Sequence, residues 1–201
     1  MWYAVRMATK NYSIIIFDCF GVLYDEVTPQ WFQRYFGAEE GAQRKPEYFI
    51  PADLGTLEEE QLWEQLAALV HRSADAIRQE FNELARPRKE VLAYARELSA
   101  SHKIILGSNA CAPWQRRIFE RDGVTDLFDH LFISSEMGIR KPDRAFFEHI
   151  LDALGVEAES ILFIDDKERN IIAAREVGMD ALRCDSTQQV LPDLKRILCG
   201  D

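Results

Sequence analysis

The chain has 201 residues, of which 47% are hydrophobic and 29% charged, and 34 acidic against 24 basic side chains give a formal net charge of −10. This composition is typical of an ordinary globular protein and excludes a collagen, a disordered tail and a disulfide-rich miniprotein. The acidic balance argues against a nucleic-acid partner, and no apolar run reaches the roughly 18 residues that a membrane helix needs.

The first predicted element is a buried strand over 13–17, an apolar run that ends at Asp18. The pattern then changes, because residues 25–86 contain no convincing strand. Apolar residues at helical spacing instead predict three helices, over 29–36, 56–70 and 73–84. A helical block inserted after the first strand is expected to be a cap over the strand ends or a separate interaction module.

Beyond residue 87, strands and helices alternate along the chain. Apolar runs predict strands over 103–106, 130–133 and 160–164, with 181–182 as a short fifth strand. Helical spacing predicts helices over 87–100, 112–121, 142–154 and 168–177. Continuous apolar strands are typical of parallel sheets covered on both faces, so this alternation predicts a doubly wound, Rossmann-like α/β fold with an inserted all-helical cap.

The four cysteines and the N-terminus bear on the compartment. Cys19, Cys111, Cys184 and Cys199 form no Cys-x-x-Cys pair, so neither a zinc site nor a redox pair is indicated. The first ten residues lack the apolar stretch and cleavage site of a signal peptide. We therefore expect a cytoplasmic protein with reduced thiols.

Polar side chains stand at the end of each predicted core strand. Asp18 follows the first strand, and the next three strands lead to Ser108-Asn109, to Ser134-Ser135 with Lys141 beyond them, and to Asp165-Asp166. Ligands of open α/β sheets gather where the carboxyl ends of the strands meet. Carboxylates, a hydroxyl and a lysine are therefore predicted to converge on one edge of the sheet.

Four short motifs in this order resemble those of the haloacid dehalogenase-like superfamily, which includes many phosphatases. They are Asp18-Cys19-Phe20-Gly21-Val22-Leu23, Gly107-Ser108-Asn109, Arg140-Lys141-Pro142-Asp143 and Phe163-Ile164-Asp165-Asp166. The resemblance covers the chain from Ser13 to about Asp185. It implies a core domain made of residues 11–24 and 87–201 and a helical cap made of residues 25–86.

The resemblance also implies roles for these residues and a magnesium cofactor. Asp18, Lys141 and Ser108 would be catalytic, with Asp18 as the nucleophile that forms an aspartyl phosphate. Ser108, Asn109 and Lys141 would bind the phosphate of a small phosphorylated metabolite. Mg²⁺ would be held by Asp18, the backbone carbonyl of Phe20, Asp165 and Asp166, because it prefers hard oxygen ligands.

Phe20 departs from the pattern of the superfamily. Most of its phosphatases carry at this position a second aspartate, which protonates the leaving alcohol and activates water, and phenylalanine can do neither. Tyr24, Asp25 and Glu26 follow closely, but the sequence does not show which of them, if any, replaces that group. Two alternatives therefore stay open: a 2-haloacid dehalogenase that uses Asp18 without metal, and a catalytically weak binding or regulatory protein. The physiological substrate and the oligomeric state are also left open.

Overall fold

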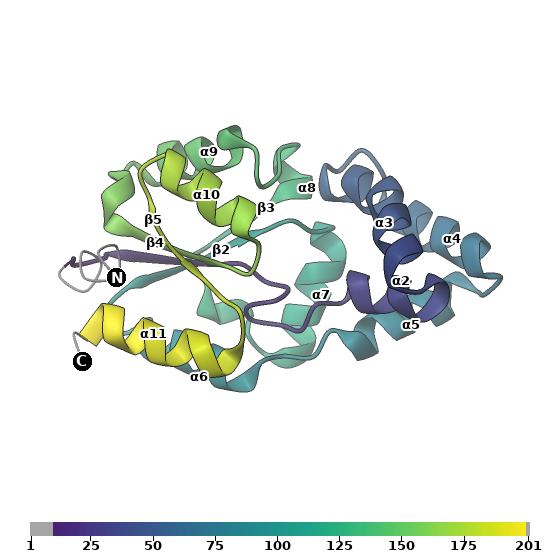
Figure 1. The fold of residues 1–201 in the computed structure, drawn as a ribbon, viewed down its shortest axis with the longest axis horizontal. Coiled ribbons are helices and arrows are strands. Elements are labelled where there is room, and N and C mark those ends of the chain that lie inside the picture. Colours follow the sequence, from purple (N-terminus) through teal and green to yellow (C-terminus); the bar gives the residue numbers. More distant parts are fainter. Residues whose placement is uncertain (1–9, 200–201) are drawn as a thin grey trace.

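The computed structural model describes residues 10–199, and its centre is a parallel five-stranded sheet (Figure 1). The strand order is β3-β2-β1-β4-β5, so the first strand of the chain lies in the middle. The strands are β1 (Ile14–Phe17), β2 (Lys103–Ser108), β3 (His130–Ile133), β4 (Ile161–Asp165) and β5 (Asp180–Arg183). The predicted doubly wound fold is confirmed.

Strand β1 is apolar at every position because both of its faces are covered. Ile15 and Phe17 belong to the core on one face of the sheet, and Ile14 and Ile16 belong to the core on the other. Helices α6 (Lys89–Leu98), α7 (Ala112–Asp122) and α11 (Thr187–Cys199) contribute to the first core, while α9 (Arg144–Leu154) and α10 (Glu168–Glu176) contribute to the second. A continuous apolar run is therefore what a central strand of a three-layer fold requires.

Four helices lie together beyond one end of the sheet (Figure 1). They are α2 (Thr28–Phe36), α3 (Ala38–Asp53), α4 (Glu59–Val70) and α5 (Ala74–Leu84). The chain segments that lead into and out of this group are hydrogen-bonded: the N–H of Asp25 donates to the carbonyl of Arg86 at 2.9 Å, and the N–H of Arg88 donates to that of Leu23 at 2.8 Å. The helical cap predicted from the sequence is thus present as an insertion between β1 and α6.

Helix α3 was not predicted, because Gly41, Pro46 and Pro51 weaken a helical pattern. Tertiary packing compensates: Phe49 of α3 stacks on Phe81 of α5, with ring centroids 5.8 Å apart. The N-terminal end of α3 also lies so close to α2 that a Cβ added at Gly41 would come within 2.9 Å of the Phe32 backbone.

One helix start and two further helices also differ notably from the prediction. Helix α9 begins at Arg144 rather than at Pro142, because a turn containing the cis Lys141–Pro142 bond precedes it. The short helix α8 (Ser134–Met137) lies where a loop was expected. The C-terminal helix α11, with Pro192 inside it, was not predicted. Among residues 10–199, no helix is both long and apolar enough to cross a membrane.

Candidate active site

Three carboxylates lie together at the carboxyl ends of the two central strands. The register pairs Phe17 of β1 with Ile164 of β4, so Asp18 follows one strand directly beside Asp165 on the other. Asp166 is the next residue along the chain. One oxygen from each of the three carboxylates lies within 4.8 Å of the other two. Parallel pairing of two apolar strands therefore builds this acidic cluster.

Lys141 lies between two of these carboxylates. Its ammonium is 2.8 Å from Asp18 Oδ1 and 2.6 Å from Asp165 Oδ2, and only 1% of the residue is exposed. Burial alone would lower the pKa of Lys141, but Asp165 and Asp18 outweigh that effect and raise the pKa to about 12. Lys141 therefore carries a fixed positive charge at the base of the site.

Asn109 positions the backbone of Lys141. Its Nδ2 donates to the Lys141 carbonyl at 2.8 Å, and its Oδ1 accepts from the Lys141 N–H at 2.9 Å. Both ends of the amide are engaged in this way, while Asn109 still lines the cavity above. The Asn109 side chain thus connects the second motif to the third. Its role in binding phosphate stays a prediction.

Asp165 and Asp166 differ in how far their oxygens are satisfied. The Nδ2 of Asn170 donates to both oxygens of Asp165 at 2.9 and 3.0 Å, and the Lys167 N–H donates to Asp165 Oδ1 at 2.8 Å. Asp166 Oδ2 accepts from the Lys167 ammonium at 2.6 Å. In contrast, Asp166 Oδ1 is buried and accepts no hydrogen bond from any described residue.

The loop after β1 is shaped around Asp166. A Cβ at Gly21 would lie 2.5 Å from the Asp166 carboxyl carbon, and Gly21 has a φ of +96°, which favours glycine. The loop thus holds Asp166 beside Asp18. A buried carboxylate oxygen with no donor, within a cluster of three carboxylates, fits a hard divalent cation such as Mg²⁺. The residues present therefore fit the metal that the motifs imply.

Ser108 ends β2, but its side chain is completely buried beneath the site. Its Oγ accepts a hydrogen bond from Gln115 Nε2 at 2.9 Å. The residues described as lining the cavity include its neighbour Asn109 and not Ser108. The direct contact between this hydroxyl and a phosphate that the motifs imply stays a prediction.

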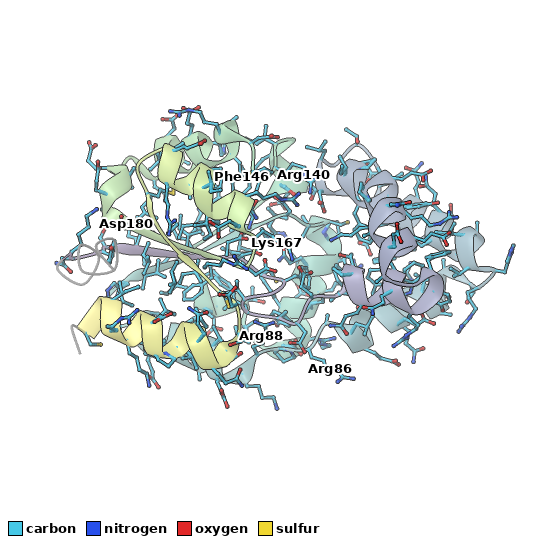
Figure 2. All side chains as sticks on the ribbon, in the orientation of Figure 1. Arg86, Arg88, Arg140, Phe146, Lys167 and Asp180 are labelled. Carbon is cyan, nitrogen blue, oxygen red and sulfur yellow. The ribbon has the colours of Figure 1, made fainter. Side chains whose placement is uncertain are left out.

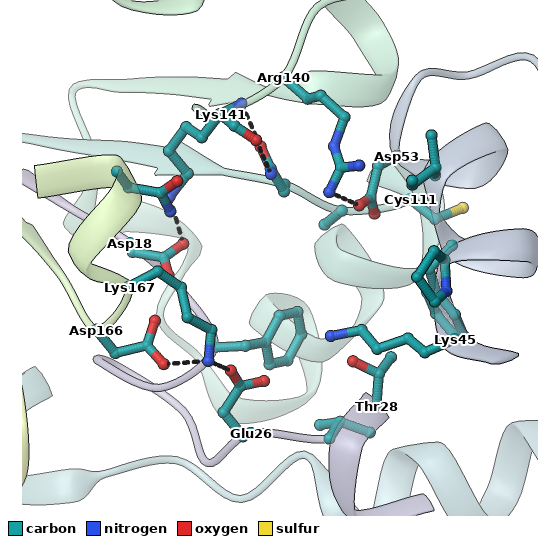
Figure 3. Close-up of a pocket in the computed structure, with 18 of the residues that line it drawn as sticks. Asp18, Glu26, Thr28, Lys45, Asp53, Cys111, Arg140, Lys141, Asp166 and Lys167 are labelled. Atoms are coloured by element: carbon teal, nitrogen blue, oxygen red, sulfur yellow. Dashed lines mark hydrogen bonds and ion pairs between the residues drawn. The ribbon is translucent and has the colours of Figure 1, made fainter. Parts of the chain in front are cut away.

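A cavity of about 240 Å³ separates the strand ends from the cap (Figure 3). The wall formed by the strand ends and their loops contains carboxylates of the acidic cluster and several basic side chains, and the opposite wall comes from the cap. The core contributes Asp18, Asn109, Arg140, Lys141, Asp166 and Lys167, and the cap contributes Lys45, Phe49, Asp53, Leu62 and Trp63. Figure 2 also places Arg140 and Lys167 at the end of the sheet that faces the cap.

Several of these residues were missed by the sequence analysis. Arg140 is the first residue of the third motif and Lys167 directly follows the fourth, and those positions were signals that could have identified them. Lys45 and Asp53 lie on α3, the helix that was not predicted, so no motif marked them. The Asp53 carboxylate pairs with the Arg140 guanidinium at 3.0 Å and thereby joins the cap to the core.

The three residues considered as substitutes at Phe20 point in different directions. The hydroxyl of Tyr24 donates to Asp122 at 3.0 Å, and Asp25 pairs with Arg88 at 3.2 Å. Glu26 instead lines the cavity and pairs with the Lys167 ammonium. Of the three, Glu26 is therefore the one placed at the site.

The side chain of Phe20 forms part of an aromatic wall. Its ring stacks on Trp114 of α7, with centroids 5.2 Å apart and an interplanar angle of 13°. Trp114 in turn meets the ring of Trp63 on α4 edge to face at 5.9 Å. These rings all line the cavity, so an apolar surface runs from the loop that bears Asp18 into the cap.

The fold and the acidic cluster together define a capped α/β enzyme built around a carboxylate at the end of its central strand. Residues 12–178 match the family model of haloacid dehalogenase-like hydrolases, and the chain belongs to this family. The resemblance inferred from the four motifs is confirmed, and the protein is a hydrolase.

The chain is similar in sequence to a phosphatase and similar in fold to two enzymes of known structure. The chain is 28% identical over 164 residues to the sesquiterpene phosphatase astK of Aspergillus oryzae, covering 73% of this chain and 84% of that protein. An enzyme of Bacteroides thetaiotaomicron described as belonging to the HAD (haloacid dehalogenase) family was crystallised with magnesium and inorganic phosphate. Its structure matches this chain with a TM-score of 0.74 at 19% identity, over 90% of this chain and 99% of that one. The L-2-haloacid dehalogenase of Xanthobacter autotrophicus has a TM-score of 0.64 at 21% identity, over 94% and 84%. The two structures share the fold with this chain.

Asp53 should give the stability of the protein a measurable pH dependence. Burial raises its pKa to about 6, and the attraction of Arg140 and Lys45 offsets this only in part. Because the folded pKa lies above the ordinary value, the contribution to stability is lost as pH rises through 6 and grows as pH falls. Relative to Asp53→Asn, the wild type should gain about 2 kcal/mol between pH 7 and pH 4.5 in urea unfolding. The prediction would be contradicted if the wild type's unfolding free energy, relative to that of Asp53→Asn, stayed constant or increased as the pH rises.

Proposed function

We propose that this hydrolase is a magnesium-dependent phosphatase that acts on small phosphate monoesters through an aspartyl phosphate on Asp18. The observation that carries this proposal is the cluster of Asp18, Asp165 and Asp166, in which one buried Asp166 oxygen has no hydrogen-bond donor among the described residues. The phosphatase named among the relatives, and the structural neighbour crystallised with magnesium and phosphate, support it.

Charge explains why such a site needs a cation. A phosphate monoester is a dianion, and a carboxylate that attacks it at about 4 Å meets a repulsion of roughly 4 kcal/mol per pair of unit charges at an effective dielectric near 20. Asp18, the backbone carbonyl of Phe20, Asp165 and Asp166 would hold the metal. When bound, Mg²⁺ would offset this repulsion and polarise the phosphoryl oxygens. Lys141 contributes a further positive charge below the site.

The chain's own residues then account for the two steps. A carboxylate oxygen of Asp18 attacks phosphorus, the bond between phosphorus and the ester oxygen breaks, and that oxygen departs with the bonding electron pair. Water next attacks the phosphorus of the aspartyl phosphate, which releases inorganic phosphate and regenerates Asp18. Asn170 and the Lys167 N–H keep Asp165 oriented during both steps. Residues 25–86 would act as the cap that excludes solvent, over a core of residues 11–24 and 87–201.

The cavity walls indicate the kind of alcohol that departs. Phe20, Trp63 and Trp114 provide an aromatic surface next to Asp18, with Leu62 and Phe49 beyond it. We infer that the substrate is a small phosphorylated metabolite whose alcohol part is largely apolar. The relative named as a sesquiterpene phosphatase supports this inference, because a sesquiterpene is a hydrocarbon skeleton.

The dehalogenase alternative fits this site less well. A halide leaves without protonation, which would make Phe20 acceptable, and the fold is shared with a haloacid dehalogenase. Without a metal, however, Asp166 would place a buried and unsatisfied carboxylate oxygen beside the nucleophile. Such a group disfavours an anionic substrate such as a haloacid.

Hydrolysis of 4-nitrophenyl phosphate tests the proposed function. We expect turnover in 5 mM MgCl₂ to fall at least about a hundredfold in excess EDTA, and to return when magnesium is restored. The departing 4-nitrophenolate needs little protonation, so turnover can be measured even though Phe20 cannot donate a proton. Release of chloride from 2-chloropropionate in EDTA would instead support the dehalogenase. A folded protein with neither activity would support the binding or regulatory alternative.

A further inference from the structure

Lys45 lies on α3 of the cap, above the acidic cluster. It lines the cavity together with Phe20 and Trp63, and Figure 3 shows its ammonium pointing from the cap into the cavity, near Glu26 and Thr28. Asp18 lies on the other side of the same cavity. A phosphate on Asp18 would therefore present its departing oxygen toward the wall from which Lys45 extends.

The other basic side chains near Lys45 are already engaged. Arg140 pairs with Asp53, Lys141 with Asp18 and Asp165, and Lys167 with Asp166 and Glu26. Within residues 10–199, no carboxylate or carbonyl accepts a hydrogen bond from the Lys45 ammonium. Arg169 also reaches the cavity, but it is exposed, and a guanidinium does not release its proton near neutral pH.

We propose that Lys45 is the proton donor to the departing alcohol, the role that Phe20 cannot fill; this rests on the proposed phosphatase activity. The inference stands on the juxtaposition of two features on opposite walls of one cavity: a phenylalanine beside the nucleophile, and an unpartnered ammonium that extends from the cap. It makes Lys45 a catalytic residue supplied by the inserted helices.

The proton balance closes over the two steps. As the bond between phosphorus and the ester oxygen breaks, the Lys45 ammonium gives one proton to the departing oxygen, which would otherwise leave as an alkoxide, and a neutral alcohol departs. The resulting amine then takes one proton from the water that attacks the aspartyl phosphate. Phosphate leaves, Asp18 is regenerated, and Lys45 is again an ammonium.

The electrostatic environment of Lys45 suits a proton donor. Burial lowers the pKa of Lys45, and the nearby Lys167 and Arg169 lower it further, while Glu26 and Asp53 raise it. The net direction of the pKa shift is downward, which makes the Lys45 ammonium a stronger acid than an ordinary lysine. These four groups come from the segment before α2, from α3 itself, from α10 and from the residue preceding α10.

Glu26 is the competing candidate, because its carboxylate also lines the cavity. Its oxygen is paired with the Lys167 ammonium, which in turn contacts Asp166. Both members of this contact are therefore already engaged at the edge of the cavity. A role for Glu26 as donor would require that pair to break in every cycle.

Leaving-group dependence tests this proposal, with kcat/KM measured for 4-nitrophenyl phosphate, phenyl phosphate and an alkyl phosphate such as n-octyl phosphate. We expect Lys45→Met to lower kcat/KM for the alkyl ester by about 10²- to 10³-fold and for the nitrophenyl ester by less than about tenfold. Lys45→Arg keeps the positive charge but does not donate, so it should show the same selective loss. The control is Lys103→Met, which replaces an exposed lysine at the start of β2. It should leave kcat/KM unchanged for both the alkyl and the nitrophenyl ester.

A second readout is the burst of 4-nitrophenol in Lys45→Met, because slower attack of water should let the aspartyl phosphate accumulate. Thermal unfolding checks that each variant is folded. Equal loss for all esters in a folded Lys45→Met would overturn the proposal and make Lys45 a binding residue. Full activity of that variant, or a selective alkyl loss in Glu26→Gln instead, would overturn it as well. A wild type that hydrolyses no phosphate ester would refute the proposed function itself.

Discussion

Replacing Asp18 with asparagine is expected to lower the hydrolysis of 4-nitrophenyl phosphate by at least about a thousandfold. An amide oxygen is a poor nucleophile toward phosphorus, so the first bond cannot form at a useful rate. The side chains have the same shape, and asparagine removes one of three crowded carboxylates, so the variant should stay folded. The measurement is kcat/KM in magnesium, accompanied by the midpoint of thermal unfolding.

The control for this variant is Asp75→Asn, which changes an exposed aspartate of the cap that pairs with Arg78. It should leave kcat/KM unchanged. Mass spectrometry of acid-quenched wild-type enzyme should also find one phosphoryl group on the peptide that contains Asp18, and none in Asp18→Asn. A folded Asp18→Asn variant that retains more than about a tenth of the activity would disprove the nucleophilic role.

The second large effect is expected on stability, from Lys141→Met. Lys141 is buried between Asp18 and Asp165, and removing it leaves two carboxylates without their shared cation. Loss of one partner from a buried ionic group typically costs about 3–5 kcal/mol of unfolding free energy. Magnesium should narrow this deficit, because a cation that binds the same carboxylates replaces part of the missing charge.

Urea unfolding with and without 5 mM MgCl₂ measures both parts of this prediction. Lys103→Met serves as the control again, since an exposed lysine should change the stability by less than about 0.5 kcal/mol. If Lys141→Met lowered the free energy of unfolding by less than about 1 kcal/mol, the lysine would not be needed to stabilise the two buried carboxylates. A deficit that magnesium leaves unchanged would argue that the cation does not bind between them.

The sheet was predictable because each buried strand leaves a short apolar run in the sequence, and such runs recur along the chain. A strand buried on both faces must be apolar at consecutive positions, and Ile14–Phe17 and Ile161–Asp165 show that pattern directly. The alternation of such strands with helices then fixes a parallel order. Helix α3 was not predictable in this way, because its two internal prolines and Gly41 oppose a helix, and packing against α2, α4 and α5 outweighs them.

The part of the candidate site that lies at the strand ends was predictable for the same reason, and the cavity wall that the cap provides was not. Asp18, Lys141 and Asp165 each follow a recognisable strand, and parallel pairing brings strand ends together. Lys45 and Asp53 reach the cavity only because of how the inserted helices dock. That docking depends on the Asp53 pair with Arg140 and on Gly55, where a Cβ would lie 2.2 Å from the Ser135 carbonyl oxygen. Such long-range contacts leave no periodic signal in the sequence.

Two backbone hydrogen bonds, between Asp25 and Arg86 and between Arg88 and Leu23, bring together the segments that enter and leave the group of helices α2 to α5. Because its two ends lie side by side, a different helical insert with similarly spaced ends could be grafted there without changing the register of the sheet. Chimeras of this kind would keep the strand-end residues of the candidate site and gain a different cavity wall opposite them. Substrate choice in such a hydrolase scaffold can therefore diversify by exchange of a whole segment, without change to the residues at the strand ends.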